Sequence, residues 1–98
     1  MKICFIYILA SKKNGTLYVG VTSNIVKRVY EHKHEIHQGC FSSKYSCKLL
    51  EYYEILSDIN LAIEREKKLK EGSRLQKLKL IDSFNPAWND LYTQVCRF

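Results

Sequence analysis

The most constraining feature of the chain is a nearly unbroken apolar run at its start, followed directly by a turn signal. Residues 3–10, ICFIYILA, are almost all apolar, so a strand formed here needs cover on both of its faces. Asn14-Gly15 strongly favours a two-residue hairpin turn, because both residues tolerate positive φ. A second strand is expected over about residues 16–21. The chain is therefore predicted to begin with an antiparallel hairpin that other elements cover on both sides.

The rest of the sequence predicts one more strand and three helices. The strand is expected over residues 48–56, KLLEYYEIL, and the helices over about residues 24–34, 59–72 and 74–84. Candidate N-caps precede each helix, namely Thr22, Ser23 or Asn24, then Ser57 or Asp58, and then Ser73. Residues 34–46, HEIHQGCFSSKYS, are predicted to form a loop. The order ββαβαα predicts a single α/β (α+β) domain over residues 1–98, with a three-stranded antiparallel-type sheet flanked by about three helices.

Length and charge narrow the classes of protein that remain. The 98 residues suit one compact domain, and no apolar run approaches the roughly 20 residues of a membrane span. The opening MKICFIYILA imitates a short signal peptide, but we interpret it as the first strand of a cytoplasmic chain, in which Cys4 is a reduced core residue. The net charge of +6 favours a polyanionic partner, nucleic acid first. The alternative is a solvated surface that is merely basic.

Two tyrosines and a glycine are expected to share one face of the hairpin. A turn at Asn14-Gly15 would place Tyr7 opposite Thr22. Since residues two apart point to the same side of a strand, Tyr7 and Tyr18 would then lie on one face. Gly20 would leave bare backbone between them. The alternative interpretation is a pair of core tyrosines with a glycine that lets a helix approach.

The first helix adds an arginine and a histidine to this neighbourhood. Arg28 and His32 are four residues apart, so they stack along the helix at the edge of its buried stripe. Both side chains are expected to reach across the end of the second strand. The neighbouring His34 and His37 do not complete a common zinc-ligand spacing with His32.

The second helix carries an acidic residue on its predicted buried side. That stripe is expected to consist of Ile59, Ala62, Ile63 and Leu69. Glu66 lies near its middle, whereas Glu64 points away. An inward carboxylate is costly unless it meets a cation, a metal or a cleft. Lys70 lies on the same stripe, so an internal Glu66–Lys70 pair is the alternative to a metal site.

Basic residues are concentrated near the second and third helices. The candidate nucleic-acid contacts are Lys27, Lys67, Lys70, Arg74 and Lys77. Such a run would suit the phosphate backbone of a nucleic acid, although it is also typical of a solvated face.

Taken together, these residues resemble the GIY-YIG nuclease domain over nearly the whole chain, from Phe5 to about Leu91, and especially its small standalone members. The resemblance rests on Phe5-Ile6-Tyr7 and Tyr18-Val19-Gly20 as the signature tripeptides, on Arg28 and His32, on Glu66 within REKKLK, and on Asn85 within NPAWNDL. Phe5 stands where the family has glycine, and Val19 where it has isoleucine.

The resemblance implies an endonuclease that hydrolyses DNA, duplex or branched, with one divalent ion, Mg²⁺ or Mn²⁺. Glu66 would hold the ion and Arg28 would bind the scissile phosphate. Tyr7 is the first candidate for general base, Tyr18 and His32 would orient groups or relay protons, and either is an alternative base. Asn85 would position the site. Larger members carry a separate DNA-binding or partner domain, so a protein partner is expected to supply specificity. The alternative function is a non-catalytic nucleic-acid-binding module with a dormant site.

Overall fold

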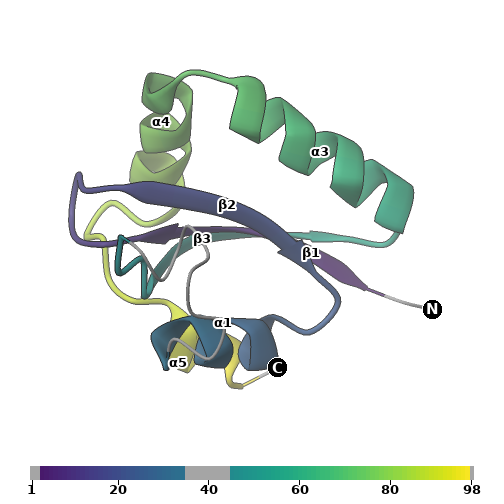
Figure 1. Cartoon of the computed structure of the whole chain (residues 1–98), viewed down its shortest axis with the longest axis horizontal. Helices are drawn as coiled ribbons and strands as arrows, with labels where there is room; N and C mark the ends of the chain where they lie inside the picture. The colour runs from purple at the N-terminus through teal and green to yellow at the C-terminus, as the bar shows by residue number, and fades with distance from the viewer. Residues whose placement is uncertain (1–2, 35–44, 98) are drawn as a thin grey trace.

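The computed structural model describes residues 3–34 and 45–97, and these form one sheet between two layers of helices (Figure 1). The strands are β1 (Cys4–Ala10), β2 (Leu17–Thr22) and β3 (Leu49–Leu56), and the helices are α1 (Ile25–Lys33), α3 (Ile59–Glu71), α4 (Arg74–Phe84) and α5 (Tyr92–Val95). The sheet is antiparallel with the strand order β2-β1-β3. The predicted fold class and the order ββαβαα are confirmed, and the short α5 is an element that the sequence did not predict.

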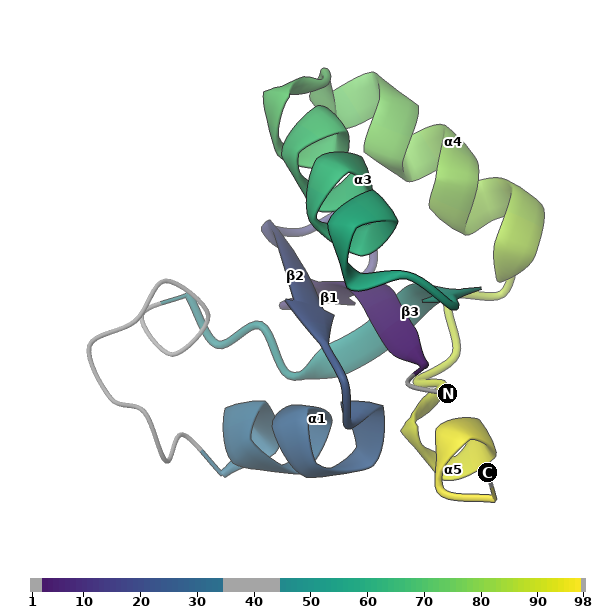
Figure 2. The same cartoon turned by 90° about the vertical axis from the view of Figure 1, so that its right-hand side faces the viewer.

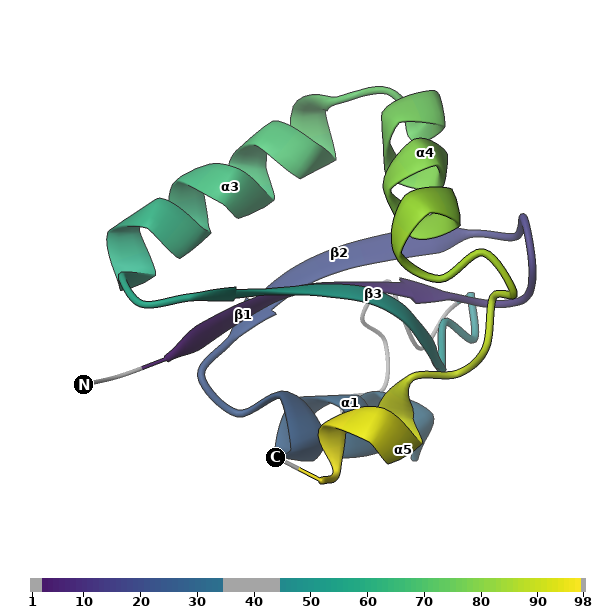
Figure 3. The same ribbon diagram turned by 180° about the vertical axis from the view of Figure 1, so that it is seen from behind.

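The central strand is covered on both faces, as its apolar run requires. Helices α3 and α4 lie over one face of the sheet, and α1 and α5 lie over the other (Figures 2 and 3). Alternate residues of β1 divide between two cores: Cys4, Ile6, Ile8 and Ala10 pack toward α3 and α4, whereas Phe5, Tyr7 and Leu9 pack toward α1 and α5. Every residue of β1 is buried, which makes this strand the rigid support of the domain.

The register of the hairpin differs from the prediction. Tyr7 pairs with Gly20 and Leu9 pairs with Tyr18, whereas the two-residue turn would have placed Tyr7 opposite Thr22. The shift is two residues, and strand side chains alternate with a period of two. Tyr7 and Tyr18 therefore still lie on the same face, which confirms the prediction on which the site depends.

The hairpin loop explains the shift. The Ser11 N–H donates to the Thr16 carbonyl at 3.0 Å, and the Ser11 hydroxyl accepts from the Thr16 N–H at 3.0 Å. These two bonds close a loop of the residues between them, so Asn14-Gly15 is only part of the turn. Asn14 adopts the left-handed conformation that the sequence predicted for it, with φ of 59°. A side-chain bond to the backbone thus selects the longer loop.

For each of the three predicted helices, one of the predicted N-cap residues is confirmed. Asn24 caps α1 by accepting from Lys27 N at 3.1 Å, and Asp58 caps α3 by accepting from Asn60 N at 2.8 Å. Ser73 caps α4 in the same way. Each cap satisfies a backbone donor that the first turn of a helix leaves free.

The buried stripe of α3 is narrower than predicted. Ala62 and Leu69 are buried, but Ile59 is 49% exposed and Ile63 is 39% exposed. At about 100° per residue, Ile59 and Ile63 lie on the same side of the helix as Glu66. The prediction for the two isoleucines is therefore wrong, because that side of α3 extends past the narrow sheet into solvent. Glu66 accordingly lies at the rim of the buried stripe.

Three smaller findings complete the fold. Within residues 3–34 and 45–97, no helix is long and apolar enough to cross a membrane. Cys4 is buried as predicted, and the described cysteines Cys4, Cys47 and Cys96 are free thiols. Residues 35–44, which include His37 and most of the predicted loop, lie outside the described residues.

Candidate active site

The site begins where the central strand places a tyrosine beside a glycine. Tyr7 is 1% exposed on β1 and pairs with Gly20 on the edge strand β2. A Cβ atom at position 20 would overlap the Cζ and hydroxyl of the Tyr7 ring. Gly20 is therefore required for the Tyr7 hydroxyl to pass across β2, and it does not serve the approach of a helix.

Helix α1 brings a histidine to this hydroxyl. Tyr7 Oη lies 3.1 Å from His32 Nε2 in a buried hydrogen bond. The Tyr18 ring packs beside both, with centroids 6.3 Å from Tyr7 and 5.2 Å from His32. We call Tyr7, Tyr18 and His32 the aromatic cluster. Hydrogen-bond and ring contacts thus fix the Tyr7 hydroxyl relative to α1.

Arg28 lies one turn before His32 on the same helix. Its guanidinium is half-buried, and Nη1 donates to Glu31 Oε1 at 3.3 Å. Burial opposes the Arg28 charge, but its interactions with Tyr7 and Glu31 outweigh burial and raise the pKa of Arg28. The result is a fixed cation next to the Tyr7 hydroxyl.

The Tyr7 hydroxyl is nevertheless held in its neutral form. Burial is the main cause that raises the pKa of Tyr7 well above its ordinary value, and the neighbouring Tyr18 and the carboxylate of Glu66 raise it further. The Arg28 guanidinium lowers the pKa of Tyr7 but does not offset burial. At neutral pH, Tyr7 therefore keeps its hydroxyl proton, and this hydroxyl shares a hydrogen bond with His32 Nε2.

Glu66 reaches the site from the other layer of the molecule. It lies on α3, over the opposite face of the sheet from α1 (Figure 2), yet its charge acts on the Tyr7 hydroxyl. Its side chain is 18% exposed, and Oε1 lies 3.4 Å from Lys70 Nζ. The site thus straddles the β2 edge of the sheet, with Arg28 and His32 on one side and Glu66 on the other. The predicted alternative, a Glu66–Lys70 pair, is also present.

Asn85 is held at the opposite edge of the sheet. Its side-chain amide donates to the Glu51 carbonyl at 3.3 Å, to Glu51 Oε2 at 3.0 Å and to the Asn89 carbonyl at 2.7 Å. Its Oδ1 accepts from Asn89 N at 3.2 Å. These contacts fasten the segment after α4 to β3. The structure therefore brings together five of the six predicted catalytic residues and places Asn85 elsewhere.

Sequence reasoning missed the carboxylate that Asn85 contacts. Glu51 is 0% exposed and lies at a bulge in β3, where the pairing with β1 shifts between Ile8 and Leu9. Burial, and then repulsion from Asp90, raises the pKa of Glu51 to about 7, although Lys33 lowers it. Glu51 Oε1 has no hydrogen-bond partner among the described residues. A bulge breaks strand alternation, so the sequence pattern gave no signal for this residue.

The predicted basic residues lie in several places. Lys67 is exposed, and Lys27 lines a hollow of about 380 Å³ beside Arg28. Lys70 and Lys77 line another hollow, of about 420 Å³, together with Leu17, Tyr18 and Val19. Arg74 Nη2 donates to the carbonyls of Asn14 and Gly15 at 2.7 and 2.6 Å. Arg74 therefore braces the hairpin loop.

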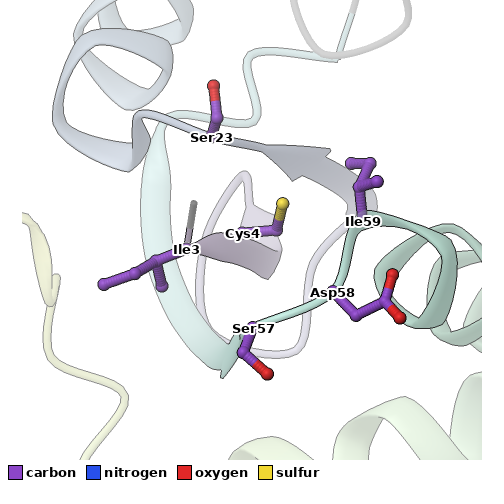
Figure 4. A pocket seen from close by; sticks show the side chains of 6 residues that line it. All are labelled: Ile3, Cys4, Ser23, Ser57, Asp58 and Ile59. Atoms are coloured by element: carbon purple, nitrogen blue, oxygen red, sulfur yellow. The ribbon is translucent and has the colours of Figure 1, made fainter. Parts of the chain in front are cut away.

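A larger hollow lies at the far end of β1 and holds none of the predicted site residues. It measures about 910 Å³ and is lined by Ile3, Cys4, Ser23, Ser57, Asp58 and Ile59 (Figure 4). The Asp58 carboxylate is engaged in capping α3. The candidate site is therefore distinguished by the convergence of ionisable groups at the β2 edge and not by the size of its hollow.

A metal at this edge would depend on few protein ligands. In residues 3–34 and 45–97, no three His, Cys, Asp or Glu side chains lie together in a way that could hold an ion. The partly exposed carboxylate of Glu66 fits Mg²⁺ or Mn²⁺, since Mg²⁺ retains water ligands and uses substrate phosphate oxygens.

Comparison with known proteins identifies the class of domain to which this fold and cluster belong. Residues 3–79 match the family described as the GIY-YIG catalytic domain, and the chain belongs to this family. The family points to nuclease activity, a divalent metal and a nucleic-acid substrate in general.

Relatives of similar size come from bacteria and a virus. The chain is 30% identical to a UPF0213 protein of Desulfotalea psychrophila, over 90% of this chain and 79% of the relative. It is 37% identical to a UPF0213 protein of Staphylococcus saprophyticus, over 79% of this chain and 92% of the relative. It is 33% identical to a UPF0213 protein of Autographa californica nuclear polyhedrosis virus, over 82% of this chain and 77% of the relative. No solved structure matches the chain significantly.

Proposed function

We propose that this protein is a metal-dependent endonuclease that hydrolyses phosphodiester bonds in DNA. The observation that carries the proposal is the convergence of Tyr7, His32, Arg28 and Glu66 on one edge of the sheet. Phosphodiester hydrolysis needs a deprotonated water and compensation for the charge on the attacked phosphate. The site offers a proton path, a fixed guanidinium and a carboxylate for these tasks.

Arg28 and Glu66 account for the charge. Arg28 binds a non-bridging oxygen of the scissile phosphate, and its bond to Glu31 keeps the guanidinium in place. Glu66 would hold one Mg²⁺ or Mn²⁺ ion, which neutralises phosphate charge and polarises the phosphorus–oxygen bonds when bound. The weak pair with Lys70 leaves this carboxylate accessible.

Tyr7 and His32 account for the proton. A buried neutral phenol is a poor base by itself, but its hydrogen bond to His32 provides a proton acceptor in the tautomer that leaves Nε2 without a proton. As the water oxygen attacks phosphorus, Tyr7 Oη takes the water proton and passes its own proton to Nε2. The bond from phosphorus to the leaving oxygen breaks, and this oxygen takes a proton from solvent. His32 then returns its extra proton to solvent, and Tyr18 packs against both rings to keep them aligned.

Two features are compatible with the alternative function, a DNA-binding module with a dormant site. The raised pKa of Tyr7 and the Glu66–Lys70 pair are what an inactive site would also show. We favour the enzyme because the Tyr7–His32 bond and the required Gly20 position a reactive hydroxyl, which binding alone does not need. A protein partner that selects the substrate is part of the same proposal.

A cleavage screen tests the proposal. The protein is incubated with Mg²⁺, Mn²⁺ or EDTA and with single-stranded, duplex, branched and damaged DNA, and with RNA. We expect cleavage of DNA that EDTA abolishes, and a loss of about 10² to 10⁴-fold in Tyr7→Phe. Tyr53→Phe is the matched control, because Tyr53 is a buried tyrosine on the same face whose hydroxyl accepts from Gln94. Absence of cleavage with every substrate, or equal rates in both variants, would contradict the enzyme.

A further inference from the structure

A basic groove runs along the β2 edge directly beside the aromatic cluster. Its first part is the hollow of about 420 Å³ lined by Leu17, Tyr18, Val19, Lys70 and Lys77. A second hollow of about 270 Å³ shares Leu17 and Lys77 with it and adds Thr16 and Arg74. The shared residues make the two hollows neighbours along the strand. We call them together the β2 groove.

The groove combines an apolar floor with cationic walls. Leu17 and Val19 pack with the core beneath α3 and α4, and their outer surfaces line the hollow. None of the side chains that line the two hollows is acidic. A lining of apolar, aromatic and cationic side chains matches the sugar, base and phosphate of a nucleotide.

The cations of the groove differ in how much charge they can offer a ligand. Lys77 Nζ donates to the Gly72 carbonyl at 3.0 Å, which is a neutral acceptor and leaves the positive charge uncompensated. Lys70 lies 3.4 Å from Glu66, and half of its side chain is exposed. Arg74 binds the carbonyls of the hairpin loop and so shapes the wall. Lys77 and Arg74, which both donate to neutral carbonyls, are therefore the main sources of positive charge in the groove.

The groove opens onto the reactive groups through Tyr18. This residue lines the hollow and also packs against His32 at 5.2 Å between ring centroids. Lys70 links the same two regions, because it lines the hollow and contacts Glu66. A phosphate attacked at the cluster would thus have its neighbouring nucleotide beside Tyr18.

A second basic hollow on the molecule does not share these features. It measures about 500 Å³, lies between α3 and α4, and is lined in part by Arg65, Lys68 and Lys79. Arg65 is committed to Glu54 through three contacts of 2.9 to 3.2 Å. No residue of the aromatic cluster lines this hollow. It therefore supplies control positions.

We propose that the β2 groove binds the nucleotide adjacent to the scissile phosphate, with its sugar and base against Leu17 and Val19 and its phosphate near Lys77 and Lys70. This inference rests on the proposed nuclease function. It separates the basic residues into two sets, since Lys77 and Lys70 contact substrate at the site and Lys67 and Lys79 do not. It also gives Tyr18 a substrate-contacting surface in addition to its packing against His32.

Binding in the absence of metal tests the groove separately from catalysis. The probe is a fluorescein-labelled DNA hairpin with a single-stranded arm, measured by fluorescence anisotropy in EDTA at several salt concentrations. Lys77→Met is compared with Lys79→Met, which removes the same charge from the same helix outside the groove. We expect Lys77→Met to weaken binding about tenfold and to reduce the salt slope by about 1. We expect Lys79→Met to change binding less than twofold.

A second variant tests the apolar floor, and cleavage separates the possible failures. Leu17→Glu should weaken binding more than Lys77→Met, because it places a negative charge on the apolar floor of the groove. Thermal melting tests whether this variant is folded. If Leu17→Glu is unfolded, Leu17→Ser is measured in its place. Equal binding by Lys77→Met and Lys79→Met would overturn the groove, whereas wild-type cleavage with Mg²⁺ would leave the nuclease standing. Lys77-dependent binding without any cleavage would support the groove and defeat the nuclease. Failure of the wild type to bind the hairpin would overturn the groove, and cleavage with Mg²⁺ would decide the nuclease separately.

Discussion

Each edge of the sheet holds a carboxylate, but the carboxylate is fully buried at the β3 edge and partly exposed at the β2 edge. The outer side of β3 is covered by the segment after α4, where Leu91 N donates to the Leu50 carbonyl at 2.7 Å and Asp90 accepts from Leu50 N at 3.1 Å. Glu51 is buried there against Asn85. The β2 edge instead carries the hollow beside Tyr18 and the partly exposed Glu66.

Under the proposed function, this difference assigns stability to one edge of the sheet and reactivity to the other. A covered edge satisfies its backbone groups and is protected from pairing with other chains, so it can hold a buried carboxyl as part of the structure. An open edge leaves room for substrate, and a carboxylate with one weak partner can exchange that partner for an ion. Substitutions at the two edges should therefore affect different quantities.

The largest expected effect is on activity at the β2 edge. Glu66→Gln keeps the shape of the side chain but removes its charge, so we expect metal-dependent cleavage to fall by about 10³-fold. The free energy of unfolding should change by less than about 1 kcal/mol, because the lost pair involves a half-exposed Lys70. Cleavage assays and thermal melting, without metal and with excess Mg²⁺, measure both quantities.

Glu64→Gln is the matched control, since Glu64 lies on the same helix and is exposed. It should leave cleavage and stability unchanged. A clear loss of stability in Glu66→Gln without metal, combined with no stabilisation of the wild type by Mg²⁺, would instead assign Glu66 to an internal ion pair.

The largest effect on stability is expected at the β3 edge. Asn85→Ala removes a buried amide with contacts to Glu51 and Asn89 and leaves the Glu51 carboxyl without that donor. Unsatisfied buried groups cost about 1 to 3 kcal/mol each, so we expect a loss of roughly 3 kcal/mol in urea denaturation. If Asn85→Ala instead kept its stability and lost more than about tenfold of its cleavage, Asn85 would act at the site.

Gly20→Ala should affect both quantities together. The added methyl group would overlap the Tyr7 ring, which is packed between β2 and α1 and cannot move freely. We expect a loss of about 2 to 3 kcal/mol of stability and a loss of cleavage as the Tyr7–His32 bond is displaced. Gly72→Ala is the control, because its nearest neighbour would be the end of the exposed Gln76 side chain. Equal melting temperatures for the two variants would show that Tyr7 adapts.

The sequence predicted the fold and the positions of most candidate site residues, because those features depend on local rules. The apolar run of β1, the caps at Asn24, Asp58 and Ser73, and the i, i+4 spacing of Arg28 and His32 each have a short-range physical cause. The prediction that Tyr7 and Tyr18 share one face was correct although the predicted register was wrong. The register error was two residues, and a shift by an even number of residues leaves every side chain on the same face of the sheet.

The features that the sequence did not predict depend on long-range geometry. The bulge that buries Glu51 is set by pairing with β1 and by the segment after α4. The exposure of Ile59 and Ile63 follows from the narrow sheet beneath α3, which no helical periodicity reveals. The placement of Asn85 at β3 depends on how the chain returns after α4, so a motif alone could not locate it.

The smallest effect is a pH dependence that originates at the covered edge. The pKa of Glu51 is raised to about 7 in the folded protein, chiefly by burial, whereas it has the ordinary value of 4.5 when unfolded. Between these values the folded state binds more protons, so its stability falls as pH rises through this window. The charged groups that act on Glu51 are Asp90, which raises its pKa, and Lys33, which lowers it.

The variant Glu51→Gln has no carboxyl to titrate. The free energy of unfolding of the wild type should therefore fall by about 2 kcal/mol relative to this variant between pH 5 and 7.5. Urea denaturation of both proteins across this range measures the difference, in which the titration of histidines common to both cancels. A constant difference would mean that the Glu51 carboxyl ionises at its ordinary pKa, and that the β3 edge admits water as the β2 edge does.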